Sequence, residues 1–258
     1  MKKIFFLALL CQFTNFSFSQ TKEFLKFNAT VAGKNEEPDE KILPALSGNL
    51  TFIKMNVYMG LDGEKNNFSF VVGYGKVKTH ARYGAGVNVS MSSSIDKTVQ
   101  NTLLGPGVFL NHSKNGTEFE VKSHFGIGVK NTVDNWAQKQ FFLESELGKE
   151  ITGTKFSLYI SGQYLYTKSK EPGQFIYGYV LLHQQYNHPS DVKYLERRAS
   201  INTSVVFAIT KYLSMSGGPQ LNLNKNEVYN GEPLARTPGE PVQNWNYLSV
   251  FGKIRLQF

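Results

Sequence analysis

The sequence has one cysteine in 258 residues and no apolar run long enough to cross a membrane as a helix. A spanning helix needs about 20 mainly apolar residues, and the run from Ile4 to Leu10 is much shorter. The single cysteine, Cys11, has no partner with which to form a disulfide within the chain. These absences exclude a helical membrane protein and intrachain disulfides.

A strong excess of one charge sign is also lacking. Lys and Arg number 28 against 20 Asp and Glu, and without Lys2 and Lys3, which lie in a segment that looks removable, the balance is 26 − 20 = +6. The cations are scattered, and no motif that reads DNA or RNA accompanies them, so we expect no nucleic-acid partner. Aromatic residues make up 14% of the chain, too many for a disordered protein.

The first 19 residues have the three parts of a secretory signal peptide. Lys2 and Lys3 are followed by the apolar run Ile4 to Leu10 and by a polar stretch that ends in Ser17-Phe18-Ser19-Gln20. We therefore expect cleavage after Ser19, a signal peptide of residues 1–19, and a single exported domain of residues 20–258. Lipidation at Cys11 is the alternative, but the bulky Leu9 and Leu10 argue against it.

Apolar and polar residues alternate over long stretches of the remaining chain. Strands of soluble β-sandwiches are most often about 5–6 residues long, whereas here the alternation continues for about 10 residues or more, which is typical of a tilted strand that crosses a bilayer. A secreted sandwich is the alternative. One face of 81–92 carries Ala81, Tyr83, Ala85, Val87, Val89 and Met91, and one face of 117–130 carries Phe119, Val121, Phe125, Ile127 and Val129.

The last segment alternates in the same way and ends in an aromatic residue. Ile254, Leu256 and Phe258 share a face with Leu248 and Val250, while Lys253, Arg255 and Gln257 lie on the other face. Here the chain resembles bacterial outer-membrane β-barrel proteins. The resemblance implies that Ile254, Leu256 and Phe258 form the C-terminal signal that the barrel-assembly machinery recognises. The stretch Ser17 to Gln20 and the Gly-Gly-Pro segment within 212–223 also look like small barrels of the Bacteroidota.

The strand count is 12 or 10, because single-chain bacterial barrels have an even number of strands. Two segments, 24–31 and 175–186, either both span or both do not. Loop lengths favour 10, since that register places the tight turns 113–116, 151–153 and 210–211 in the periplasm; chain economy favours 12, towards which we lean. The other strands are expected near 49–60, 67–78, 80–92, 101–111, 117–130, 137–150, 154–168, 199–210, 212–224 and 244–258.

The polar faces of these strands define a set of charged residues that we expect to face the lumen. Across neighbouring strands, Glu118, Glu120 and Lys122 should lie close to Glu144 and Glu146. The set would form either a selective polar path or a salt-bridged filling, and a narrow barrel favours filling. Glycines on the lumen face would make room for larger side chains opposite. The expected lumen network is Lys54, Arg82, Glu118, Glu120, Lys122, His124, Glu144, Glu146, Lys253 and Arg255.

The string from His112 to Gly116 is the one catalytic-looking motif. Outer-membrane lipid hydrolases resemble it in placing His, Ser and Asn near one another, but they separate the His and the Ser by one residue. Here His112 and Ser113 are adjacent and would point to opposite faces of a strand. Lys114-Asn115-Gly116 is instead typical of a hairpin turn.

The expected function is therefore that of a non-enzymatic, integral outer-membrane β-barrel of a Gram-negative bacterium. An accessory or structural subunit of an envelope complex is favoured over a small-solute pore or transporter, and an outer-membrane lipid hydrolase is the third alternative. The expected partners are outer-membrane lipid and lipopolysaccharide, the barrel-assembly machinery and other envelope proteins. No cofactor or metal is expected.

Overall fold

The computed structural model describes residues 23–34, 41–63, 67–93, 100–131, 137–171, 192–230 and 243–258. The expected signal peptide and the expected strand at 175–186 lie outside these ranges. In the described part of the chain, no helix is long and apolar enough to cross a membrane.

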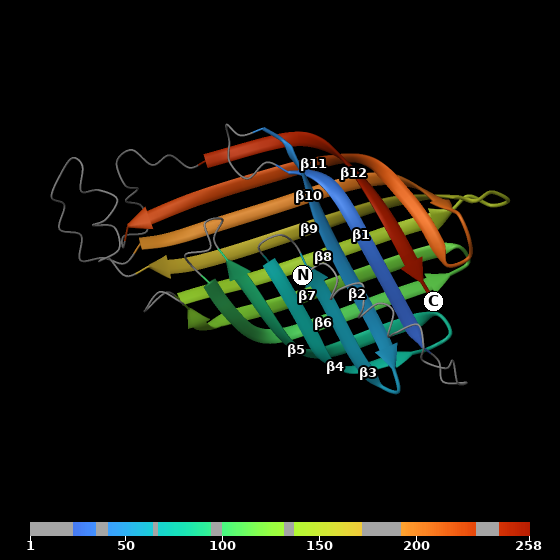
Figure 1. Cartoon of the computed structure of the whole chain (residues 1–258), viewed down its shortest axis with the longest axis horizontal. Helices are drawn as coiled ribbons and strands as arrows, with labels where there is room; N and C mark the ends of the chain where they lie inside the picture. The colour runs from blue at the N-terminus through green and yellow to red at the C-terminus, as the bar shows by residue number, and fades with distance from the viewer. Residues whose placement is uncertain are drawn as a thin grey trace, which may run out of the picture.

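Twelve antiparallel strands form a closed up-and-down barrel, in which each strand pairs with its sequence neighbours and β1 pairs with β12 (Figure 1). The predicted all-β barrel of 12 strands is confirmed, and the 10-strand alternative is excluded. The strands are β1 (Phe24–Lys34), β2 (Leu43–Lys54), β3 (Val57–Gly63), β4 (Asn67–Val77), β5 (Ala81–Ser93), β6 (Gln100–Lys114), β7 (Thr117–Asn131), β8 (Ala137–Glu150), β9 (Phe156–Glu171), β10 (Val192–Ala208), β11 (Leu213–Asn230) and β12 (Gln243–Gln257).

The prediction of one strand over 49–60 was wrong. That segment contains the end of β2, a tight turn at Met55 and Asn56, and the start of β3. Both turn residues have positive φ, 51° and 65°, which is the backbone of a type I′ hairpin turn. The two-residue turn reverses the inward-facing parity, because Ile53 and its partner Tyr58 both point inward. The apolar and polar residues nevertheless keep alternating in the sequence from Ile53 to Met59, so hydropathy alone did not reveal the turn. This hairpin supplies a strand that was not predicted.

Among the connections that the structure describes, the tight turns lie at one end of the barrel, together with Phe24 and Phe258; we call this the terminal end and the opposite one the loop end (Figure 1). The predicted turns near 113–116, 151–153 and 210–211 are confirmed. In the first of them Asn115 and Gly116 both have positive φ, as an Asn-Gly turn favours. The tight turns join β2 to β3, β4 to β5, β6 to β7, β8 to β9 and β10 to β11.

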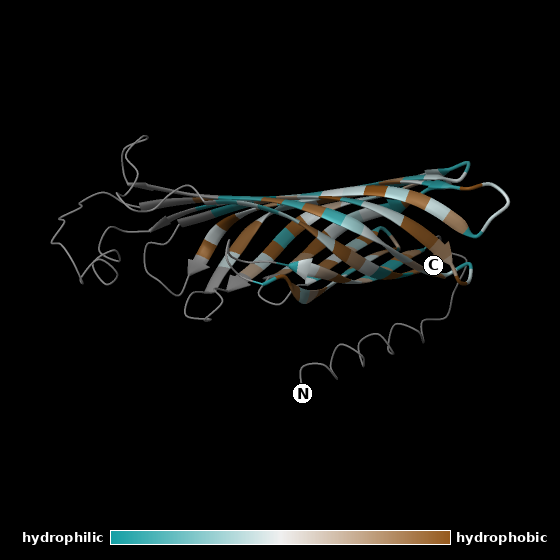
Figure 2. Cartoon of the chain, turned by 90° about the horizontal axis from the view of Figure 1, so that it is seen from above, coloured by the Kyte–Doolittle hydropathy of each residue, from teal (hydrophilic) through white to brown (hydrophobic). Residues whose placement is uncertain are grey.

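The two faces of the wall are opposite in polarity to those of a soluble protein, and hydropathy alternates along the strands (Figure 2). On β5, Val87 is 52% exposed on the outer face, whereas Asn88 is fully buried on the lumen face. On β12, Val250 is 74% exposed and Arg255 is 7% exposed. An apolar outer wall around a polar interior is the arrangement of a barrel that sits in lipid.

The wall is uneven in height. β3 has 7 residues, whereas β9, β10 and β11 have 16, 17 and 18. The three long strands extend furthest at the loop end (Figure 1). One side of the barrel therefore rises well beyond the other.

Candidate functional site

All of the predicted lumen residues except Lys54 lie on the inner face of the barrel. Lys54 shares its face of β2 with Leu50 and Phe52, because Thr51 and Ile53 point inward and are 1% exposed. Its Nζ lies 2.6 Å from Glu23 Oε1 at the terminal end. The prediction placed Lys54 on the wrong face, because it treated 49–60 as one strand and did not allow for the turn at Met55 and Asn56.

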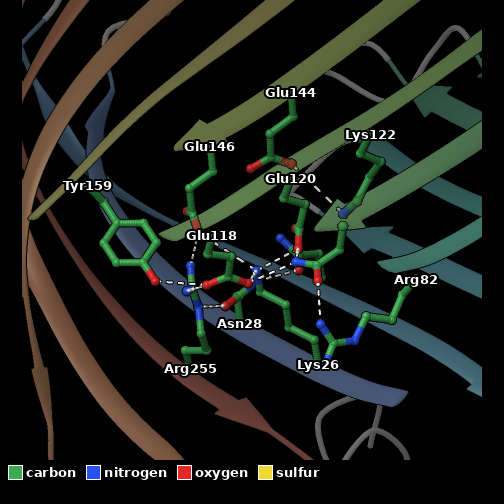
Figure 3. Close-up of polar contacts among 12 residues, drawn as sticks. Lys26, Asn28, Arg82, Glu118, Glu120, Lys122, Glu144, Glu146, Tyr159 and Arg255 are labelled. Atoms are coloured by element: carbon green, nitrogen blue, oxygen red, sulfur yellow. Dashed lines mark hydrogen bonds and ion pairs between the residues drawn. The ribbon is translucent and has the colours of Figure 1, made fainter. Parts of the chain in front are cut away.

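Lys26 joins opposite walls of the barrel (Figure 3). It extends from β1, is 1% exposed, and places Nζ 2.7 Å from Glu120 Oε2 on β7. The same Nζ lies 3.6 Å from Glu118 Oε1 and 3.7 Å from Glu146 Oε1. Since β7 is six strands away from β1 in either direction around the barrel, these contacts cross the lumen.

Two cations of β12 complete the same group. The Arg255 guanidinium donates to Glu146 Oε1 through Nη2 and to Asn28 Oδ1 through Nε at 3.1 Å. Its Nη1 lies 3.5 Å from Glu118 Oε2. Lys253 Nζ lies 2.7 Å from Glu146 Oε2. Glu146 thus sits among three cations, which offset the repulsion from Glu120, its direct cross-strand neighbour.

Tyr159 on β9 holds the remaining side of Glu118. Its hydroxyl donates to Glu118 Oε2 at 2.8 Å, and its ring lies 5.2 Å below the Arg255 guanidinium carbon. The ring also rests on Gly148 of β8, where an added Cβ would lie 2.2 Å from Tyr159 Cε1. A glycine is needed at that position because the ring occupies the space of a side chain.

A second bridge lies beside the first. Lys122 on β7 places Nζ 2.8 Å from Asp62 Oδ1 on β3 and 3.8 Å from Glu144 Oε2 on β8. Gln163 of β9 donates to Glu144 Oε1 at 3.2 Å. The predicted proximity of the β7 and β8 charges is therefore found, and Asp62 extends the network to the other side of the lumen.

The network is balanced in charge. Arg82 belongs to it through Asn111, to which it donates at 3.4 Å and which in turn donates to both Glu118 and Glu120. Buried charges must be paired or hydrogen-bonded to be tolerated, and equal numbers of the two signs leave this network without a net charge. The cations are Lys26, Arg82, Lys122, Lys253 and Arg255, and the anions are Asp62, Glu118, Glu120, Glu144 and Glu146.

The neighbouring part of the lumen is filled by apolar side chains. Phe24, Ile53, Tyr58, Val71 and Phe109 form a buried cluster. The ring of Phe109 stacks on those of Phe24 and Tyr58, with centroids 5.9 Å apart in each pair. Tyr58 fits because Gly84 faces it, and a Cβ on Gly84 would lie 2.3 Å from Tyr58 Cγ. The expectation that lumen glycines accommodate larger side chains is met here.

Sequence reasoning missed several members of this site. Lys26 lies on the polar face of an alternating segment, so the signal was present, but the segment was counted as an optional strand. Asp62 fell outside the expected strand 49–60. Tyr159 and Phe24 carry no sequence signal for a lumen position beyond their place in the alternation, since aromatic residues are also common on the outer wall.

His124 also faces the lumen, as predicted. It is 7% exposed and stacks on Phe142, with ring centroids 4.8 Å apart. The string from 112 to 116 contains the end of β6 and the hairpin turn at Asn115 and Gly116, with His112 exposed and the adjacent Ser113 on the lumen side of β6. In the described part of the chain, no group of three or more His, Cys, Asp or Glu is placed to hold a metal ion.

No family model matches the chain, and no curated protein matches it. Solved structures do. Neisserial surface protein A matches with a TM-score of 0.32 and 11% identity over 93% of this chain and 100% of its own. In vitro-folded OmpT, an outer membrane protein of Vibrio cholerae, matches with a TM-score of 0.44 and 6% identity over 92% of this chain and 97% of its own. An anion-selective porin from Comamonas acidovorans matches with a TM-score of 0.24 and 9% identity over 93% of this chain and 99% of its own. These similarities are too low to transfer a function.

Proposed function

We propose that this chain is a sealed, non-enzymatic barrel of the Gram-negative outer membrane that serves as an accessory or structural subunit of an envelope complex. The observation that carries the proposal is the Lys26–Glu120 contact of 2.7 Å, which joins opposite walls of the lumen. An open pore needs a continuous aqueous path, and these side chains occupy the place of one. The terminal end faces the periplasm, because barrels of this class have short periplasmic turns and longer external loops.

Opening the lumen would require separation of buried ion pairs. Lys26 and Lys122 are 1% and 4% exposed, and each is held by carboxylates from other strands. Removing one partner of a buried pair costs about 3–5 kcal/mol, because the other charge stays buried without compensation. Beside the ion pairs, the cluster around Phe109 fills its part of the lumen with apolar side chains. A barrel that is closed in this way acts through its outer wall or its loops.

The outer wall also supports a partner in assembly. Ile254 on the outer face of β12 and Phe258 directly after this strand are each 45% exposed. They are available there to machinery that reads the last strand of a barrel. Other envelope proteins would dock on the same outer wall or on the loops.

A small-solute pore is the second candidate function, and the wall opposite the apolar cluster favours it. On the lumen face of β9 to β11, neutral polar side chains lie beside the ion pair of Glu196 and Arg198, and Gln163 among them is exposed. A path along this wall would suit an uncharged polar solute. Its members include Ser161, Gln163, Ser200, Asn202 and Gln220.

Conductance separates the two functions. The full chain, reconstituted in a planar lipid bilayer, should show no stepwise conductance. The double variant Lys26→Ala, Glu120→Ala removes the bridge between the walls and should raise conductance. The matched control Glu196→Ala, Arg198→Ala removes a pair on one strand, with Arg198 Nε 2.5 Å from Glu196 Oε1, and should leave conductance unchanged. Stable single-channel steps from the unmodified protein would refute the sealed barrel.

The accessory role has its own test. The tagged chain, extracted from membranes in mild detergent, should run in native mass spectrometry with a stoichiometric protein partner. Recovery of the barrel alone, together with channel activity, would establish the pore in its place.

A further inference from the structure

Four cations form a row on the outer wall near the loop end. Lys139 of β8 is the direct cross-strand partner of Lys168 of β9. Arg197 of β10 is the partner of Lys225 of β11, and also of Tyr166, which lies two residues before Lys168. The row therefore continues across four adjacent strands. Lys139, Lys168 and Arg197 are exposed, and Lys225 is half-buried.

The row lies just beyond the apolar band of the wall. On β9 the outward positions run from Phe156 to Tyr166 before the first cation, Lys168. These 11 residues cover about 33 Å of strand at ~3.3 Å per residue, or about 25 Å along the barrel axis at a tilt of ~40°. That height matches the lipid-facing band of an outer-membrane barrel. The cations consequently reach the level of the lipid headgroups.

Aromatic residues mark the same boundary. On β8 the next outward residue after Lys139, towards the apolar band, is Phe141, and on β9 Tyr164 and Tyr166 precede Lys168. The rings of Phe141 and Tyr164 lie 6.4 Å apart in a tilted arrangement. Aromatic girdles occur where the hydrocarbon meets the headgroups, so their position supports the assignment of the level.

The pair Lys139–Lys168 differs from the cations inside the barrel. Like charges directly opposite each other on neighbouring strands are destabilising. Within the part of the chain that the structure describes, neither ammonium group has an ion-pair or hydrogen-bond partner. Lys26 and Lys122 in the lumen are held by carboxylates. Arg197 and Lys225 have other contacts, and Glu227 is the acid of β11 nearest to them in register, opposite Leu195.

We propose that Lys139 and Lys168, flanked by Arg197 and Lys225, form a binding site for a phosphate group of lipopolysaccharide in the outer leaflet. A phosphate monoester carries a charge of about −1.5 to −2 at neutral pH. It would neutralise the ammonium groups of these two lysines, whose Cβ atoms lie about 5 Å apart as direct cross-strand partners. The aromatic residues below would contact the acyl chains and sugars of the same molecule. The site rests on the outward orientation of the loop end and holds whether or not the barrel conducts.

Binding of lipid A by the full chain in detergent tests the site. Diphosphoryl lipid A, titrated and read by native mass spectrometry, should bind at least tenfold more tightly than the same lipid after phosphatase treatment. The double variant Lys139→Gln, Lys168→Gln should weaken binding of the diphosphoryl form roughly 10- to 30-fold. The matched control Lys76→Gln, Lys155→Gln neutralises two exposed lysines away from the row and should bind as the unmodified protein does.

Lys139→Glu separates binding from folding. The new carboxylate would face Lys168 and replace a repulsive pair with an attractive one, so the barrel should unfold at the same or a higher temperature. Phosphate binding should nevertheless fall at least as far as in the double variant. Unchanged binding in both variants, or equal binding of phosphatase-treated lipid A, would overturn the proposal. Neither result depends on the conductance measurements, so the failure of one proposal is distinguishable from that of the other.

Discussion

The two sides of the lumen are filled by different kinds of side chain. Beside β1 to β6, Phe24, Tyr58 and Phe109 stack into an apolar cluster that resembles the core of a soluble protein. Towards β7, β8 and β12, charged side chains such as Lys26 and Glu146 occupy the space instead. Apolar packing fills space without directional partners, whereas each buried charge requires specific ones. The two sides should therefore respond differently to substitution.

The largest effect is expected on the charged side. Glu146→Gln leaves Lys26, Lys253 and Arg255 without their shared carboxylate, so the free energy of unfolding should fall by about 3–5 kcal/mol. Urea unfolding of the barrel in detergent micelles measures it. Glu150→Gln, on an exposed residue at the end of the same strand, is the control and should change stability by less than about 0.5 kcal/mol. Equal effects of the two variants would show that the ion-pair network does not contribute to stability.

On the apolar side of the lumen, substitutions that add side-chain volume should be destabilising. A Cβ on Gly84 would lie 2.3 Å from Tyr58 Cγ, so Gly84→Val should displace the ring and destabilise the barrel by about 1–3 kcal/mol. Tyr58→Ala removes the ring, and the double variant should recover part of the loss caused by Gly84→Val. Gly252→Val is the control, because a Cβ there meets nothing within 4 Å.

Additive losses in the double variant would contradict this explanation. The same unfolding measurement, applied to the two single variants and the double variant, gives the coupling energy between positions 58 and 84. A coupling close to zero would mean that the ring of Tyr58 does not rest on Gly84 in solution.

The sequence predicted the charged side better than the apolar side. Glu118, Lys122 and Glu146 lie on long, uninterrupted strands, where period two assigns every residue to a face. The contacts across the lumen could not be predicted, because they depend on barrel closure and strand stagger rather than on neighbouring strands. Lys26 illustrates this, since it lies on the polar face of an alternating segment, whereas nothing in the sequence points to its partners on β7 and β8.

The apolar side escaped prediction because of the hairpin that builds it. Ile53 and Tyr58 flank the turn at Met55 and Asn56, and an alternating pattern that passes unbroken through a two-residue turn looks like one strand. A barrel count of 12 therefore agreed with the structure although one of the predicted strands, 49–60, is two. The segment 175–186, which was counted in its place, lies outside the described residues.

The same turn gives the smallest expected effect and sharpens the comparison. Met55 has a φ of 51° and is 71% exposed, so it pays a conformational cost without packing in return. Asn tolerates this region of backbone better than Met and is common at the first position of a type I′ turn. Met55→Asn should therefore raise the free energy of unfolding by about 0.5 kcal/mol or more.

The stability gained by Met55→Asn should be confined to the apolar side of the lumen, to which the hairpin contributes side chains. Because β2 and β3 carry Ile53 and Tyr58 into the apolar cluster, a firmer turn should stabilise that side and leave the charged side unaffected. Combined with Glu146→Gln, it should add its full effect, since the two sites share no partner. A loss of stability on Met55→Asn would place 49–60 in one continuous strand and remove the hairpin from the barrel.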